Sequence, residues 1–451
     1  MTGLAQRAAS TLIPAEFVRE AMERYEVPGV SVGVVHGDSE EVAGFGVTSV
    51  ENPLPVDGDT LFQIGSITKT YTATAAMCLV EAGRLSLDEP VRTYLPNLRL
   101  ADEAVARAVT MRHLLNHTGG WVGDYFASIS PGDDALAQMV ARLDHLEQLT
   151  PLGEVWSYNN AGFYLAGRVI EVIAGAPFEA ALRELVLEPL DLQRSFFFAD
   201  EVLTYRFAVG HDRTGAVSRA WSIGRPAAAA GGLIASVRDL LGYARLQWEP
   251  GLLLSPESLA ELRRPQADMG RTFGDAVGLA WWVLERGVRS LLMHTGGTSG
   301  QAALLIVAPE DRFALAALTN HDQGGALNRA IQVEVLRSVL GVEPPEVARL
   351  ERTSAELAEY VGEYDSAPSA ARLTISDGEL TLEVIAKRGF PESDSPPRPG
   401  PPPTRLAFEQ RDAVVALDPP LEGARADFLR GANGELVWLR WGGRILRRVA
   451  P

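Results

Sequence analysis

Strand-type segments stand on both sides of a long helical block in this 451-residue chain. Near the N-terminus, the β-rich runs 29–36 and 41–50 flank the turn dipeptide Gly37-Asp38, which predicts an antiparallel hairpin. Residues 65–250 have mostly helical patterning. Strand character returns at 277–285, 290–294, 301–308 and 313–319. This order predicts an α+β fold in which both ends of a domain build one antiparallel sheet, with flanking helices and an inserted all-helical lobe.

The proline pair Pro344-Pro345 marks an expected boundary between two domains. Beyond it, the chain contains short β-rich runs separated by Asp-Gly, Asn-Gly and Gly-Gly turns. This spacing is typical of a meander or a small barrel. The sequence therefore predicts one domain over residues 1–345 and a small antiparallel β-barrel over residues 346–451.

Charge narrows the classes of partner. Acidic residues outnumber basic ones 58 to 41, and the formal net charge is −17. Binding to a phosphate backbone needs the opposite balance, so nucleic acid and a polybasic membrane surface are excluded as expected partners. Residues 1–18 have no uninterrupted apolar stretch typical of a signal peptide, and no later segment reaches the ~18 apolar residues of a membrane span. We therefore expect a cytoplasmic protein.

The basic residues are almost all arginine, and Lys69 and Lys387 are the only lysines. Arginine can replace lysine wherever a fixed charge is enough, but it cannot lose its proton in a protein. A lysine that remains in such a chain therefore suggests a chemical role. Lys387 lies beside Arg388 in the β-rich tail, where we expect a solvated surface charge.

Lys69 closes the segment Gly65-Ser66-Ile67-Thr68-Lys69, which opens a helical run. Positions i and i+3 share a helix face, so the Ser66 hydroxyl and the Lys69 amine can meet. The positive end of the helix dipole favours a developing alkoxide on Ser66, and a desolvated Lys69 can act as its base. The alternative is a capping serine beside a solvated lysine. The scarcity of lysine favours the chemical interpretation.

Two further segments carry residues suited to the same chemistry. Tyr158-Asn159-Asn160 precedes a predicted helix, where an asparagine cap and a packed tyrosine are the plain interpretation. His294 ends an apolar β run and is followed by glycines that allow a substrate to approach a strand edge. The backbone N–H of Gly297 is suited to an oxyanion hole, although a strand ending in a turn is the better explanation of this segment taken alone.

Together the three segments resemble the three motifs of the penicillin-recognising serine hydrolases. They are Ser66-x-x-Lys69, Tyr158-x-Asn160 and His294-Thr295-Gly296. The resemblance covers roughly residues 12–340 and is closest to the class C β-lactamase-like branch. That branch includes D-aminopeptidases, D-amino-acid amidases, carboxypeptidase-type penicillin-binding proteins and some esterases. The resemblance implies a β-lactamase/transpeptidase-like fold for the first domain.

The resemblance also implies a role for each motif residue. It makes Ser66 the acylated nucleophile, with Lys69 and Tyr158 sharing the proton transfers. Which of these two is the acylation base stays open. Asn160 is implied to bind the substrate amide, and the backbone N–H groups of Ser66 and Gly297 are implied to form the oxyanion hole.

The third motif departs from the usual pattern. His294 stands where most relatives have a lysine that helps to hold a substrate carboxylate, so efficient β-lactamase or carboxypeptidase action is less expected. Histidine here is similar to the D-aminopeptidase members. By resemblance, His294, Gly296 and Gly297 are assigned to substrate binding.

An earlier His-Thr-Gly-Gly, at residues 117–120, follows a predicted helix and precedes Tyr158, so we do not assign it to the third motif. His113 and His117 have the spacing of metal ligands. Leu114 occupies the place where a zinc-protease helix needs glutamate, so we predict no metal site and no cofactor.

The tail resembles the lipocalin-like C-terminal domain of several relatives, on the residues 360–364 and Trp441-Gly442-Gly443. The resemblance implies closure over the cleft or assembly into a homo-oligomer, and a barrel that only stabilises the chain is the alternative.

The leading hypothesis is a serine hydrolase that forms an acyl-enzyme on amide or peptide bonds of a small molecule or short peptide. A D-aminopeptidase-like enzyme or a small-peptide peptidase is most expected. The alternatives are an esterase or weak β-lactamase on the same fold, or a non-catalytic penicillin-binding-like regulatory protein.

Overall fold

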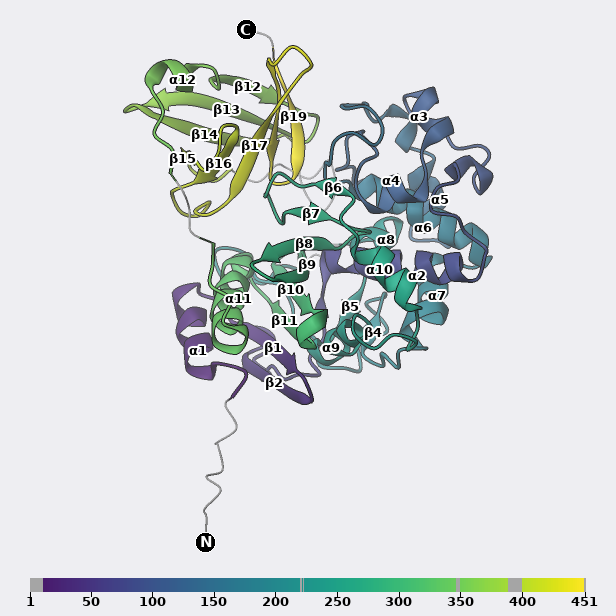
Figure 1. The fold of residues 1–451 in the computed structure, drawn as a ribbon. Coiled ribbons are helices and arrows are strands. Elements are labelled where there is room, and N and C mark those ends of the chain that lie inside the picture. Colours follow the sequence, from purple (N-terminus) through teal and green to yellow (C-terminus); the bar gives the residue numbers. More distant parts are fainter. Residues whose placement is uncertain (1–10, 220, 222, 346–348, 388–399, 450–451) are drawn as a thin grey trace.

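A central antiparallel sheet joins the two ends of the first three quarters of the chain (Figure 1). The structure is a computed structural model and describes residues 11–219, 221, 223–345, 349–387 and 400–449. The sheet order is β2-β1-β11-β10-β9-β8-β7-β6. The strand bounds are β1 Gly29–His36, β2 Ser39–Gly46, β6 Ala267–Asp268, β7 Ala276–Val277, β8 Trp282–Arg286, β9 Arg289–Thr298, β10 Gln301–Ala308 and β11 Phe313–Thr319. Because β1 pairs with β11, the predicted assembly of one sheet from both ends is confirmed.

Helices cover both faces of this sheet. On one face lie α1 (Ala15–Arg24) and α11 (Gly324–Leu340), which pack on alternate side chains of β1, β10 and β11. On the other face, α9 (Val237–Arg245) packs on β1 and β11, and the buried helix α2 (Thr68–Glu81) lies on the same side. Every residue of β1 except the last is buried, as expected for a central strand covered on both faces.

The inserted lobe is mostly helical, as predicted. Its α-helices are α3 Glu103–Ala108, α4 Met111–Leu115, α5 Ala135–Val140, α6 Asn160–Ala174, α7 Phe178–Leu182, α8 Ala228–Gly231 and α10 Pro256–Arg263. Short 3-10 or π turns are η1 Gly65–Ile67, η2 Val91–Thr93, η3 Leu143–His145, η4 Arg183–Leu187, η5 Arg225–Ala227 and, in the sheet region, η6 Pro309–Asp311. A small sheet that the sequence did not predict contains β3 Phe62–Gln63, β5 Ile234–Ala235 and β4 Ser195–Phe196.

Two strand predictions were too long. The run 277–285 is divided into β7 and β8, because the chain leaves the sheet at Ala280, which has φ +66° and donates its N–H to the carbonyl of Leu115 (2.8 Å). The run 41–50 is too long at its C-terminal end, because β2 ends at Gly46, which has φ +71°. These turns depend on contacts between distant segments and leave no local hydrophobic signal.

The C-terminal strands form a closed antiparallel barrel, which confirms the predicted fold of the tail. Its strands are β12 Gly362–Asp365, β13 Ser369–Ser376, β14 Glu379–Ala386, β15 Thr404–Phe408, β16 Ala413–Ala416, β17 Arg425–Arg430, β18 Leu436–Trp441 and β19 Arg444–Arg448, and α12 (Ser354–Ala358) precedes them. Pairing of β12 with β19 closes the barrel. The aromatic side chains of Tyr360, Tyr364, Phe408 and Phe428 pack together in its core.

The barrel contacts the N-terminal region of the chain through the buried side chain of Arg440. Arg440, on β18, has 2% exposure and donates to both oxygens of Asp427 (2.8 and 2.7 Å). The same guanidinium donates to the backbone carbonyls of Trp156 (3.2 Å) and Asp268 (3.1 Å). The structure therefore fixes the β18–β19 turn against the segment that carries Tyr158.

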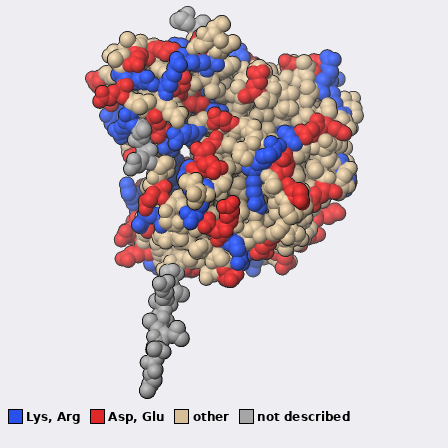
Figure 2. Space-filling model, viewed as in Figure 1, with Lys and Arg blue, Asp and Glu red and all other residues tan. Residues whose placement is uncertain are grey.

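The face drawn in Figure 2 has basic and acidic side chains interspersed over both the barrel and the sheet region. Within the described part of the chain, no helix has the length and apolar character needed to cross a membrane.

Candidate active site

Ser66 and Lys69 meet at the start of α2. Ser66 lies in the turn η1, directly before α2, and the N-cap residue of α2 is Ile67 rather than Ser66. Lys69 has 0% exposure, and its Nζ donates to Ser66 Oγ (3.2 Å) and to the carbonyl of Ala230 (2.6 Å). The capping serine with a solvated lysine is therefore excluded by the geometry.

The surroundings of Lys69 favour its neutral form. Burial, and then the positive charge of Arg444, lower the pKa of Lys69 well below its ordinary value, while the Asp124 carboxylate opposes the shift. A neutral amine has the lone pair that a proton acceptor needs. Lys387, by contrast, is partly exposed and pairs with Asp365.

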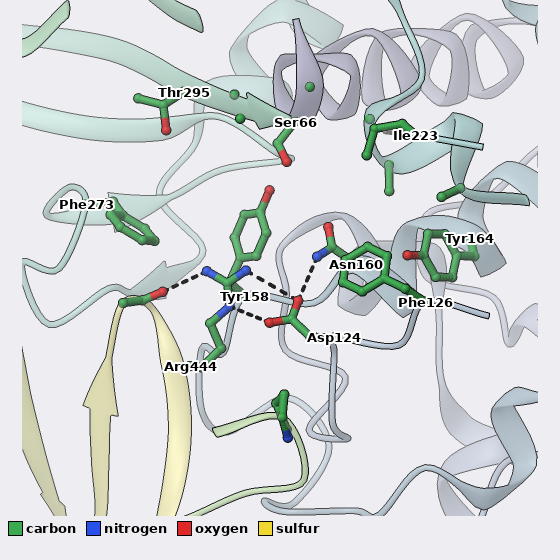
Figure 3. A pocket seen from close by; sticks show the side chains of 18 of the residues that line it. Ser66, Asp124, Phe126, Tyr158, Asn160, Tyr164, Ile223, Phe273, Thr295 and Arg444 are labelled. Atoms are coloured by element: carbon green, nitrogen blue, oxygen red, sulfur yellow. Dashed lines mark hydrogen bonds and ion pairs between the residues drawn. The ribbon is translucent and has the colours of Figure 1, made fainter. Parts of the chain in front are cut away.

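Tyr158 shares a hydrogen bond with Ser66, and their hydroxyl groups face each other across the site in Figure 3. The phenol is buried, with 4% exposure, and burial raises its pKa above the ordinary value. Lys69 Nζ lies 5.0 Å from the centroid of the Tyr158 ring, so the three groups form one cluster. Each of the two groups is placed to exchange a proton with the Ser66 hydroxyl.

Asn160 belongs to a polar wall that includes two residues the sequence analysis missed. Asn160, the first residue of α6, donates Nδ2–H to Asp124 Oδ1 (2.7 Å). Arg444, from β19, donates to both oxygens of Asp124 (3.0 and 3.3 Å), and its Cζ lies 4.6 Å from the centroid of the Tyr158 ring (Figure 3). The preceding residue, Asn159, is the cap of α6, since its Oδ1 accepts the N–H of Gly162 (2.8 Å).

The glycines of the third motif lie against the Ser66 segment. A Cβ atom on Gly296 would lie 1.8 Å from the carbonyl oxygen of Ile64, and one on Gly65 would lie 2.7 Å from the Gly297 nitrogen. Only glycine fits this close approach of β9 to η1. The backbone N–H groups of Ser66 and Gly297 are thereby brought to the same end of the site.

The structure places His294 differently from the prediction of direct substrate contact. Its side chain is fully buried, stacks on Trp282 (4.5 Å between ring centroids) and is not part of the cavity wall. Nδ1 donates to the carbonyl of Thr295 (2.6 Å), and burial, followed by the charge of Lys69, lowers the pKa of His294 to about 3. A neutral, enclosed imidazole does not hold a substrate carboxylate.

The described residues contain no cluster of metal-ligating side chains. The ring of His113 is held in the capping box of α4, with Nδ1 2.8 Å from Thr110 Oγ1. The ring of His117 instead stacks on Tyr158. The two histidines therefore do not meet as metal ligands.

A cavity of about 540 Å³ opens in front of Ser66. The N-terminal region supplies Ser66, Tyr158, Asn160, Gly296 and Gly297, together with apolar side chains such as Ile223 and Phe273. The barrel also supplies part of the wall: Pro368, Ser369, Trp441, Gly442 and Arg444. Among these lining residues, the sequence analysis had identified only those that belong to the three motifs.

Comparison with known proteins places the chain in a family. The family model described as Beta-lactamase matches residues 15–336. The chain is 33% identical over 338 residues to "Penicillin-binding protein 4" of Amycolatopsis lactamdurans, a match that covers 72% of this chain and 88% of that protein.

Two solved structures are also similar. "Crystal structure of SurE with D-Leu" has 26% identity and a TM-score of 0.75, with 96% of this chain and 98% of that chain covered. The D-amino acid amidase from Ochrobactrum anthropi SV3, complexed with L-phenylalanine amide, has 25% identity and a TM-score of 0.61 over 72% of this chain and 98% of that chain.

Proposed function

The chain belongs to the β-lactamase family and is a serine hydrolase, and on this basis we propose that it is a peptidase for small peptides with D-residues. The observation that carries the proposal is the buried contact of Lys69 with Ser66, in a protein that uses arginine almost everywhere else. A buried lysine beside a serine is suited to proton transfer during acyl transfer, and it does not serve as a solvated surface charge.

In the proposed reaction, Ser66 Oγ attacks the carbonyl carbon of the substrate amide while its proton passes to the Lys69 and Tyr158 pair. The carbonyl oxygen becomes an oxyanion, which the N–H groups of Ser66 and Gly297 stabilise. The C–N bond then breaks, and the leaving amine takes the proton. Water attacks the resulting ester, releases the acid and restores the Ser66 hydroxyl.

The size of the cavity supports a peptide over a single amino-acid amide. A second cavity of about 560 Å³ shares Phe273, Trp282, Trp441 and Gly442 with the first, so the two are neighbours along the barrel contact. Together they exceed the space that one residue needs. The D-Leu named for SurE and the amidase for D-amino acids support D-residues next to the cleaved bond.

The charges of the cavity wall bear on which end of the peptide is bound. Asp124 is the one acidic side chain among the described lining residues, and Arg444 already pairs with it. The cavity in front of Ser66 therefore offers no free carboxylate to a substrate ammonium group, whereas Asp275 and Glu343 line the neighbouring cavity. This favours a small-peptide peptidase over a strict D-aminopeptidase.

Labelling followed by a substrate panel tests the proposal. A fluorophosphonate or penicillin probe is expected to modify Ser66 in the wild-type protein and to leave Ser66→Ala unmodified. If the probe leaves the wild type unlabelled, the acyl-enzyme is excluded, and a non-catalytic binding protein becomes the better hypothesis.

The panel then contains acetylated D-alanyl peptide anilides, their L-counterparts, D-alanyl anilide with a free amine, a short-chain ester and a chromogenic cephalosporin. The highest kcat/KM is expected for the acetylated D-peptide anilide. Preference for the ester or the cephalosporin by more than about tenfold would instead identify an esterase or a β-lactamase. Homo-oligomerisation through the C-terminal barrel stays a prediction, which sedimentation of the full chain checks.

A further inference from the structure

His117 holds the backbone on both sides of Tyr158. The carbonyl oxygen of His117 accepts the N–H of Ser157 (3.1 Å), and its ring Nδ1 accepts the N–H of Asn159 (3.0 Å). The N–H of Tyr158 itself donates to Gly443 of the barrel (2.7 Å). Three consecutive N–H groups therefore have fixed partners, and two of those partners belong to His117.

The ring of His117 also touches the phenol directly. The two ring centroids are 4.5 Å apart at an interplanar angle of 25°, and the His117 side chain has 0% exposure. A stacked aromatic neighbour restricts rotation of the Tyr158 ring about its side-chain bonds. The backbone contacts and the stacking together leave the phenol little freedom to turn away from Ser66.

The ring of His117 is neutral. Its Nδ1 accepts an N–H, so the ring proton lies on Nε2, which has no hydrogen-bond partner among the described residues. Burial, followed by the charges of Lys69, His294 and Arg444, lowers the pKa of His117 well below its ordinary value. Lys69, His294 and Arg444 are the charged or titratable neighbours on α2, β9 and β19, and Tyr158 stacks on the ring from the segment before α6.

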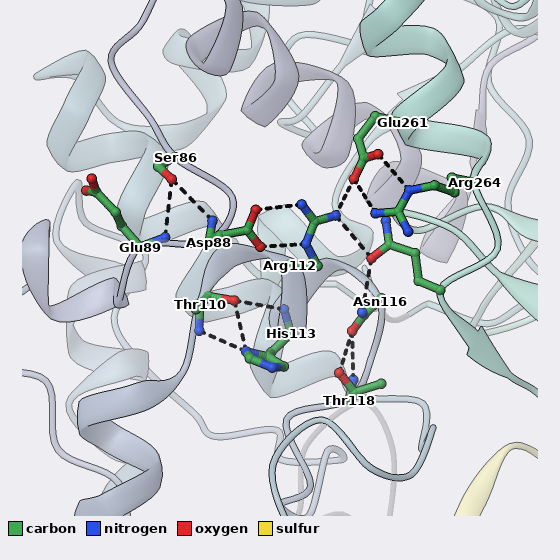
Figure 4. A network of polar contacts seen from close by, with 11 residues as sticks. Ser86, Asp88, Glu89, Thr110, Arg112, His113, Asn116, Thr118, Glu261 and Arg264 are labelled. Carbon is green, nitrogen blue, oxygen red and sulfur yellow. Dashed lines mark hydrogen bonds and ion pairs between the residues drawn. The ribbon is translucent and has the colours of Figure 1, made fainter.

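The backbone of His117 is held in an uncommon conformation. Its φ is +61°, in the left-handed region that residues other than glycine adopt uncommonly, with asparagine, aspartate and histidine as the most frequent exceptions. A network on the adjoining α4 fixes this turn (Figure 4). Arg112 donates to both carboxylate oxygens of Asp88 (2.6 and 2.7 Å). Asn116 Oδ1 accepts a hydrogen bond from the hydroxyl of Thr118 (2.6 Å). A strained residue that its surroundings hold in place is typical of functional sites.

We propose that His117 is a positioning residue that fixes the phenol of Tyr158 toward Ser66. The inference rests on the proposed role of Tyr158 in proton transfer. His117 does not line the cavity and does not exchange protons with the substrate. Its neutral ring acts only by orienting the phenol, so its removal changes the rate of acylation and not the affinity for substrate.

Two substitutions separate the two contacts of the ring. His117→Asn keeps an acceptor at the δ position and tolerates the left-handed backbone, but it removes the stacking. His117→Phe keeps an aromatic ring and removes the acceptor for the Asn159 N–H. His36→Asn, at the exposed end of β1, is the matched control.

Single-turnover acylation is measured for each variant, with KM, pH dependence and the thermal midpoint. Misplacement of a catalytic group by about 1 Å costs on the order of 100-fold, so His117→Asn is expected to slow acylation by about 10- to 100-fold with KM within about twofold. The acid limb of the pH profile for acylation is expected to stay at the wild-type pH in His117→Asn, because the His117 ring is neutral. His117→Phe is expected to lose at least as much rate, and His36→Asn to match the wild type.

The proposal is overturned if both His117 variants acylate at the wild-type rate, if only KM changes, or if the acid limb moves. It is also overturned if the folded fraction falls and the remaining molecules acylate normally, since His117 would then be only structural. Tyrosine ¹³Cζ NMR, with Tyr158→Phe for assignment, reports the order of the phenol without turnover. If the wild type is never acylated, the proposed hydrolase function fails, and an unchanged Tyr158 signal in His117→Asn still refutes the positioning role.

Discussion

The barrel arginine Arg444 is expected to set the pH at which the site becomes active. Burial, followed by the charge of Arg444, lowers the pKa of Lys69, and Asp124 raises it. When Arg444→Gln removes the positive charge, the pKa of Lys69 rises and a higher pH is needed to make the amine neutral. The acid limb of kcat/KM for acylation therefore moves to higher pH.

The magnitude follows from two distances. Lys69 Nζ is 5.0 Å, and Arg444 Cζ is 4.6 Å, from the centroid of the same Tyr158 ring, so the two charges are at most about 9.6 Å apart. At an effective dielectric constant of about 20, two unit charges at about 9.6 Å repel by roughly 1.7 kcal/mol, or about 1.3 pKa units. Solvent reaches 32% of the Arg444 side chain and screens part of this, so we expect a shift of about 1 pH unit.

Asp124→Asn provides a test of opposite sign. Removal of the carboxylate leaves Arg444 unpaired beside Lys69, so the acid limb is expected to move to lower pH. The assay is stopped-flow acylation with an activated ester between pH 4 and 10, at constant ionic strength and again at high salt. An acid limb that stays in place in both variants, or moves in the same direction in both, would refute the electrostatic reasoning. A shift of the acid limb that disappears at high salt would show that ions screen the interaction between Lys69 and Arg444 completely.

Three further outcomes are expected. Lys69→Arg keeps the charge and loses the lone pair, so acylation should fall by about 10²- to 10⁴-fold while circular dichroism stays native; a variant that retains most of its rate would remove Lys69 from the mechanism. Gly296→Ala places a Cβ 1.8 Å from the Ile64 carbonyl oxygen, so β9 must move and the acylation burst should slow, whereas a wild-type burst would contradict the close approach. Arg440→Met leaves Asp427 buried without its cation, so the free energy of unfolding measured in urea should fall by about 3–5 kcal/mol. A fall of less than about 1 kcal/mol would contradict a buried ion pair.

Local spacing predicted the parts of the site that lie close together in sequence. Ser66 and Lys69 are three residues apart, so helix geometry alone brings them together, and the structure has their polar atoms in contact. The same logic identified Asn159 or Asn160 as the helix cap. Motifs far apart in the chain were connected only through the family resemblance, because spacing says nothing about where separate strands and helices meet.

The residues that sequence reasoning missed are defined by tertiary contacts. Asp124 lies in a loop without helix or strand, and Arg444 is one arginine among 39. They are 320 positions apart in the chain, yet their side chains form an ion pair at 3.0 Å. A rare residue type such as lysine is visible in a sequence, whereas a common one becomes significant only when the fold shows what it faces. His294 illustrates the reverse case, because its motif position was recognisable but its burial was not.

The position of Arg444 also bears on why the chain carries a barrel. A barrel that served only to stabilise the protein would need no charged side chain over the Tyr158 ring, and a closed barrel has no free edge that would have to be covered. Here Gly443 accepts the N–H of Tyr158 and Arg444 lies over its ring, so the turn between β18 and β19 completes the wall of the site. A glycine pair is suited to this turn, since both glycines have positive φ, and a Cβ on Gly443 would lie 2.8 Å from the Trp156 ring. The barrel therefore supplies part of the wall of the cavity at Ser66, and close contacts with the other region restrict which residues fit at this turn.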